Sequence, residues 1–171
     1  MHDPIELYFF HDVLCSWCYV ADARLRVLKQ EFGDELRITL RPYPLRPNEQ
    51  IPDKKELQSL IRHVRRAAAE PEGRLLKPDV WRSPDVPLSS MPALKAVEAA
   101  ALQGEEVRDA FANQLREAAF IHGLNVARPD VIFELAASMR LDMNRFVRAY
   151  HSRAALAHIE QSHREAVGRG V

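Results

Sequence analysis

The pattern of hydrophobic and polar positions changes once along the chain, from a strand–helix–strand beginning to a long helical remainder. Residues 5–10 form a short apolar run that is typical of a buried strand. Residues 17–32 have helical periodicity, and Gly33 follows as the expected helix stop. Residues 36–43 alternate apolar and polar side chains, which predicts a second strand. The short connections predict a βαβ unit with parallel strands. The apolar face expected to point inward from the first helix consists of Leu25, Leu28 and Phe32.

The rest of the chain is predicted to be helical around one long loop. Residues 71–90 contain five prolines and glycines and predict a structureless segment, of a length typical of lids or disordered segments. We expect Trp81 to pack this loop down onto the protein. Helices are predicted over 53–70 and 105–122, from Ser90, from Pro129, after Asp142, and from Ser152 to Gly168. In the last of these, Leu156, Ile159 and Val167 are expected to face inward.

These elements predict an α/β fold with three parts: residues 1–48 as the βαβ unit, 49–165 as a helical insertion, and 166–171 as the start of a further segment. Parallel sheets are normally wider than two strands and covered on both faces. We therefore expect the sheet to be completed by another chain, such as a second copy in a homodimer, or by a longer form of this protein. An unpaired strand edge favours such pairing.

Charge and composition narrow the classes of partner. The chain has 24 Lys and Arg against 24 Asp and Glu, so its formal net charge is zero. This balance gives no support for binding nucleic acid or a membrane surface. The sequence has no apolar stretch near the ~20 residues of a membrane span. The start, Met1 to Pro4, lacks the basic region of a signal peptide, which predicts a cytoplasmic protein.

The two cysteines of the chain, Cys15 and Cys18, stand between the first strand and the first helix. A CxxC pair at a strand-to-helix turn is typical of thioredoxin-type redox sites, because the positive end of a helix stabilises a thiolate. Chance burial of two cysteines and a static disulfide are weaker interpretations, since so short a link removes little entropy from the unfolded chain. A zinc site that uses His11 lacks a second pair of ligands. No metal and no cofactor are therefore expected.

The segment Phe10 to Ala21, which reads FHDVLCSWCYVA, resembles the active-site segment of DsbA-like thiol oxidoreductases of the FrnE-type branch. Further segments resemble the helices of that family: 89–96, 110–120, 128–132 and 141–146. The resemblance covers essentially the whole chain. It implies a thioredoxin-like fold with a large all-helical insertion, in which 166–171 begin a C-terminal half whose strands and cis-proline lie beyond the sequence given. This chain has Ser16 where the family commonly has proline.

The expected function is thiol–disulfide exchange with protein, peptide or small-thiol substrates such as glutathione. Cys15 would attack a substrate disulfide, and Cys18 would resolve the mixed disulfide. Trp17 would offer substrates an apolar surface, and Ser16, between the cysteines, would help to set the redox poise. His11 and Asp12 would tune the Cys15 pKa or serve as polar loop residues. Two alternatives stay open: a glutathione-dependent isomerase of the 2-hydroxychromene-2-carboxylate type, and a non-catalytic thioredoxin-like interaction module.

Overall fold

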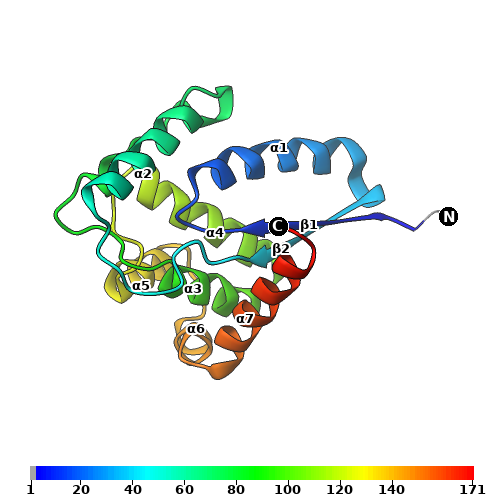
Figure 1. Ribbon diagram of the computed structural model, residues 1–171. Helices are drawn as coiled ribbons and strands as arrows, with labels where there is room; N and C mark the ends of the chain where they lie inside the picture. Colours follow the sequence, from blue (N-terminus) through cyan, green and yellow to red (C-terminus); the bar gives the residue numbers. More distant parts are fainter. Residues whose placement is uncertain (1–2) are drawn as a thin grey trace.

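The computed structural model describes residues 3–171 and contains, within them, two parallel strands with helices on both faces (Figure 1). Strand β1 (Ile5–His11) pairs with β2 (Leu36–Pro42) in a register that sets Leu7 against Ile38. Between the strands run α1 (Ser16–Phe32) and the short 3₁₀ turn η1 (Gly33–Glu35). Helix α1 covers one face of the strand pair, and α7 (Arg153–Gly168) packs against the other. The predicted βαβ unit is confirmed.

The remaining helices pack around α3, which is the centre of the hydrophobic core. Helix α3 contacts α4, α5, α6 and α7, and its residues Leu94 and Val97 are fully buried. These elements are α2 (Lys54–Ala67), η2 (Pro71–Gly73), η3 (Asp79–Trp81), α3 (Met91–Ala101), α4 (Glu105–Phe120), α5 (Pro129–Ser138) and α6 (Met143–Tyr150). Every helix predicted from periodicity is present.

Two of the expected helix N-caps form, and a third does not. The Asp142 carboxylate accepts from Arg145 N at 3.0 Å, and the Ser152 hydroxyl accepts from Ala155 N at 3.4 Å. Ser90, expected to cap α3, makes no cap hydrogen bond, because its hydroxyl is paired with the backbone of Arg46. The neighbouring Ser89 hydroxyl accepts from Met91 N instead, at 3.1 Å.

The expected burial of β1 and of the apolar stripe on α1 is wrong. Ile5 is 67% exposed, Leu28 37% and Phe32 45%. Within residues 3–171, one edge of β1 is unpaired and the second half of α1 lies largely at the surface, so these side chains stay exposed. The first part of α1 is buried instead, where the buried residues are Ser16, Cys18, Val20 and Asp22. On α7, Ile159 is buried as expected, whereas Leu156 and Val167 are exposed.

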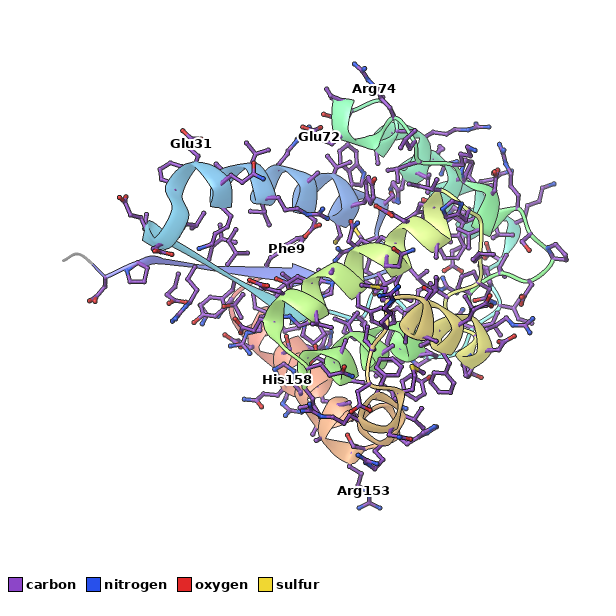
Figure 2. The ribbon with its side chains drawn as sticks, turned by 180° about the vertical axis from the view of Figure 1, so that it is seen from behind. Phe9, Glu31, Glu72, Arg74, Arg153 and His158 are labelled. Atoms are coloured by element: carbon purple, nitrogen blue, oxygen red, sulfur yellow. The ribbon has the colours of Figure 1, made fainter. Side chains whose placement is uncertain are left out.

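The segment 71–90 is ordered, which corrects the expectation of a structureless loop. It contains η2 and η3, and Trp81 is 2% exposed within the core. A Cβ at Gly73 would lie 1.9 Å from the Ala67 carbonyl oxygen, so the turn after α2 requires glycine. Arg24 on α1 pairs with Glu70 and with Glu72, which lies beside that helix (Figure 2). The loop is thus fixed both to the core and to α1.

Candidate active site

Asp12 holds the turn that leads from β1 to the cysteines. Its Oδ1 accepts from Leu14 N at 2.8 Å, and its Oδ2 accepts from Leu45 N at 2.6 Å, so one carboxylate joins this turn to the segment after β2. The side chain is 1% exposed. Burial raises the pKa of Asp12, and the hydrogen bonds from Leu45, Ser90 and Leu14 oppose that rise. Asp12 is therefore a buried anchor of this turn. Of the two roles considered for it from sequence, its charge acts on the pKa of Cys15, which it raises.

Cys15 and Cys18 lie at the N-terminus of α1, in unequal environments. Cys15 occupies the N-cap position and is half-buried, while Cys18 is buried one turn further along the helix. A hydrogen bond from the Cys18 thiol lowers the pKa of Cys15. The same hydrogen bond, together with burial, strongly raises the pKa of Cys18. The geometry thus presents one accessible sulfur that favours the thiolate and one protected sulfur that favours the thiol.

The two residues between the cysteines differ in exposure. Ser16 is 4% exposed, and Trp17 is 39% exposed at the surface of the first helical turn. Trp17 is thus exposed in the first turn of the helix that begins beside Cys15, and its contact with substrates stays a prediction. Ser16 contributes to the buried side of the same turn.

His11 lies at the end of β1 and is bound by an arginine from a distant helix. Its Nδ1 is 2.8 Å from Arg116 Nη2 on α4, which crosses the ends of the strands in Figure 2. An arginine only donates, so Nδ1 is the acceptor and the neutral ring carries its proton on Nε2. Burial and the Arg116 charge hold the pKa of His11 well below its usual range. His11 is therefore neutral at pH 7, and the positive His11 considered from sequence is corrected: the buried cation here is Arg116.

Arg116 and Asp22 are the site residues that the sequence reasoning missed. Arg116 is fully buried, and its Nη1 is 4.0 Å from Asp22 Oδ2 on α1. A signal for Arg116 was present, because it falls on the buried face of α4 at helical spacing from Ala112 and Ala119. In the same way, Asp22 lies one turn after Cys18 on the buried face of α1. A charged residue on the apolar side of a helix indicates a special partner.

Two other features of the described residues bear on ligands. No group of three or more His, Cys, Asp or Glu in residues 3–171 could hold a metal ion. A cleft of about 720 Å³ lies between α1, β2 and α4 and reaches Asp22, but its lining does not include either cysteine.

None of the described helices is long and apolar enough to cross a membrane.

Comparison with known families agrees with this geometry. The profile of the DSBA-like thioredoxin domain matches residues 6–171, from β1 to the last residue of the sequence. The chain belongs to this family. The thioredoxin-like fold with a helical insertion, expected from the residues around the CxxC pair, is therefore shown.

Among curated relatives of this DSBA-like chain is the ClpXP adapter protein SpxH of Bacillus subtilis, 31% identical over 157 residues. That match covers 90% of this chain and 50% of the relative. The chain thus spans about half the length of the curated relatives it matches. Among solved structures, a putative protein disulfide isomerase from Nitrosomonas europaea superposes with a TM-score of 0.84 at 17% identity, covering 98% of this chain and 80% of that one. The cytosolic disulfide reductase DsbM from Pseudomonas aeruginosa superposes with a TM-score of 0.77 at 22% identity, covering 97% and 80%. At these identities both structures establish the fold alone.

Proposed function

We propose that this chain carries out thiol–disulfide exchange through Cys15 and Cys18. The observation that carries the proposal is the unequal pair at the start of α1: a half-buried Cys15 whose pKa is lowered beside a buried Cys18 whose pKa is raised. Exchange proceeds through thiolates, so the accessible low-pKa sulfur is the attacking group. The protected sulfur is the resolving group. Membership in the DSBA-like family supports the same chemistry.

Atoms, protons and electrons are conserved when the exchange reaction runs in either direction. When a substrate disulfide is reduced, the Cys15 thiolate attacks one substrate sulfur, and the other leaves as a thiolate that takes up a proton. Cys18 then loses its proton and attacks Cys15 Sγ, which releases the second substrate thiolate and forms the Cys15–Cys18 disulfide. The pair loses two electrons and the substrate gains them. Oxidation of a substrate dithiol follows the same steps in reverse.

Peptide thiols and disulfides are the substrates we propose, with glutathione as the small-thiol partner. The exposed Trp17 offers an apolar contact beside Cys15 for a peptide chain. The structural relative DsbM is described as a cytosolic disulfide reductase and has also been solved with glutathione, which supports this substrate class and a cytoplasmic setting.

Trapping of the mixed disulfide tests the function. With Cys18→Ser, attack by Cys15 cannot be resolved, so we expect a stable adduct with a model peptide disulfide, seen as a mass increase. Cys15→Ser should give at least a tenfold slower adduct, because Cys18 is buried and its pKa is raised. Wild-type protein should turn over the same peptide without accumulating the adduct. Equal reactivity of the two single variants, or no adduct from Cys18→Ser, contradicts the proposal.

An adapter role is a second candidate, favoured by the 31% identity to the ClpXP adapter protein SpxH of B. subtilis. An adapter binds its partners through surface contacts and has no need of a redox cycle. The double variant Cys15→Ser/Cys18→Ser therefore separates the two functions. If the chain is an adapter, this variant still promotes degradation of a client by purified ClpXP. If degradation is unchanged when the chain is omitted, the adapter candidate is wrong.

A further inference from the structure

The Arg116 guanidinium is a buried positive charge, and no carboxylate of the described residues forms a hydrogen bond with it. Its only hydrogen bond within residues 3–171 goes to the neutral His11 ring, from Nη2 at 2.8 Å. Its Nε and Nη1 are buried without a hydrogen-bond partner in the same described range. A guanidinium stays protonated even when buried. Burying a charge without a close partner is costly, so its retention calls for a role.

Two buried carboxylates, Asp22 and Asp12, have Arg116 in their surroundings and accept hydrogen bonds from other donors. Asp22 Oδ2, 4.0 Å from Arg116 Nη1, accepts from Arg26 Nε at 3.0 Å and also from Arg26 Nη2. Asp12 is bound by two backbone N–H groups at the end of β1. Neither carboxylate forms a hydrogen bond with the Arg116 guanidinium. Asp22 lies one turn after Cys18 on the buried side of α1, so the Arg116 charge beside Asp22 lies close to the Cys18 sulfur. Its field lowers the pKa of Cys18, in opposition to burial and to Cys15.

We propose that Arg116 is a positioning residue for the exchange reaction: it fixes the His11 ring at the end of β1 and supplies a permanent positive charge that stabilises the Cys18 thiolate. This inference rests on the proposed oxidoreductase function. The Cys18 thiolate forms twice in the cycle. It is the leaving group when a substrate thiolate attacks Cys15 Sγ of the oxidised pair, and it is the nucleophile when a mixed disulfide on Cys15 is resolved. A buried sulfur needs such a charge more than the accessible Cys15 does.

The experiment compares Arg116→Met with Arg116→Lys and with the matched control Arg108→Met. Arg108 lies two turns earlier on α4 and is 7% exposed, and its Nε is paired with Asp109 at 2.8 Å. Its charge also lowers the pKa of His11, so Arg108→Met controls for the loss of a buried positive charge in this region. Methionine keeps the length and apolar bulk of the side chain and removes the charge. The readouts are the rate at which a preformed Cys15–peptide mixed disulfide is resolved and the dithiol–disulfide equilibrium in a glutathione buffer.

We expect Arg116→Met to resolve the mixed disulfide about three- to fourfold more slowly at pH 7, because a one-unit rise in the Cys18 pKa lowers the thiolate fraction about tenfold while the more basic thiolate attacks somewhat faster. The dithiol–disulfide equilibrium at pH 7 should change far less than this rate, because Cys18 is a thiol in the reduced pair with or without the Arg116 charge. Arg116→Lys should keep most of the wild-type rate of resolution near neutral pH and lose it at higher pH, because a buried lysine can deprotonate. Arg108→Met should stay close to wild type.

A wild-type rate of resolution in folded Arg116→Met overturns the inference, and so does an equal slowing in Arg108→Met. If Arg116→Met does not fold, Arg116→Lys carries the test, and the absence of a pH-dependent loss relative to wild type overturns the inference. A thiolate titration of Cys18 in the Cys15→Ser background needs no turnover. There Arg116→Met must raise the Cys18 pKa, even if the wild-type protein proves inactive in exchange. An inactive wild type therefore refutes the proposed function, and an unchanged Cys18 pKa refutes the role of Arg116.

Discussion

Asp12 shows how one side chain sets both the shape of the site and its electrostatics. Its two carboxylate oxygens accept hydrogen bonds from the backbone N–H of Leu14, which directly precedes Cys15, and from that of Leu45, which follows β2. Its negative charge also raises the pKa of Cys15, in opposition to the hydrogen bonds that lower it. Asp12 thus stabilises the conformation of the turn before the cysteines, but its charge makes the Cys15 thiolate less stable.

Asp12→Asn is therefore expected to lower the pKa of Cys15 and to destabilise the fold. The amide keeps one acceptor for two N–H donors, so we expect a loss of about 1–3 kcal/mol at acidic pH. Because burial raises the Asp12 pKa in the fold, wild type itself loses stability as the pH rises through that pKa. The deficit of the variant should accordingly shrink at higher pH. Thiolate absorbance and urea unfolding measure the two effects, and Asp34→Asn, at an exposed position after α1, is the control. An unchanged Cys15 pKa would show that the Asp12 charge does not reach the sulfur.

The local part of the site could be predicted from sequence, and its long-range partners could not. Cys15, Cys18 and the helix that follows them are contiguous, so spacing and periodicity are enough to place them. The partner of Asp12 is 33 residues away and that of His11 is 105 residues away. A single sequence carries no signal for such pairings. This is why His11 was considered as a cation, although its neighbour Arg116 makes it a neutral acceptor.

At the scale of elements, the sequence pattern predicted where the helices lie along the chain more accurately than which of their faces are buried. Periodicity placed α1 correctly, but the stripe through Leu28 and Phe32 is exposed, and the buried face contains Cys18 and Asp22. Which face of a helix is covered depends on which elements pack there, and this follows from the tertiary fold. The same reason explains the loop 71–90, where prolines predicted disorder but Trp81 fixes the backbone.

The two tryptophans should therefore respond very differently to truncation. Trp81→Ala removes a fully packed side chain from the core and should cost about 3–5 kcal/mol of unfolding free energy. Trp17→Ala acts on an exposed residue of α1 and should change stability by less than about 1 kcal/mol. Urea unfolding followed by circular dichroism measures both, and Trp81→Phe should fall between them. Similar costs at the two positions would contradict the view that the loop is anchored through Trp81.

At the scale of the whole molecule, a histidine bridge connects three elements across the helical part and the sheet. His158 on α7 (Figure 2) bonds through Nδ1 to Glu98 on α3, and its Nε2 is 3.3 Å from Arg41 Nη1 on β2. The hydrogen bond to Glu98 raises the pKa of His158. His11 shifts the other way, because burial lowers its pKa. The pH dependence of stability near neutrality is thus the difference between two opposing histidines.

The sign of each contribution follows from linkage. A group with a raised folded pKa stabilises the fold below its unfolded pKa, about 6.5 for histidine, and this contribution is lost as the pH rises through the folded value. His158 therefore favours the fold at mildly acidic pH. His11 has a lowered folded pKa, so its contribution is present above about pH 6.5 and is lost as the pH falls.

His158→Gln isolates one of the two contributions. We expect it to reduce the unfolding free energy by about 0.5 kcal/mol at pH 6, a modest value because the pair is partly exposed and screened by salt. The reduction should be smaller at pH 8.5 and in 1 M salt, since the ion pair with Glu98 exists only while His158 is protonated. Urea unfolding at the two pH values measures this, with His63→Gln on the exposed face of α2 as the control for loss of a histidine. If His158→Gln costs more at pH 8.5 than at pH 6, the neutral bridge from Arg41 through His158 to Glu98 contributes more than the protonated pair, and the expected sign of the His158 contribution is wrong.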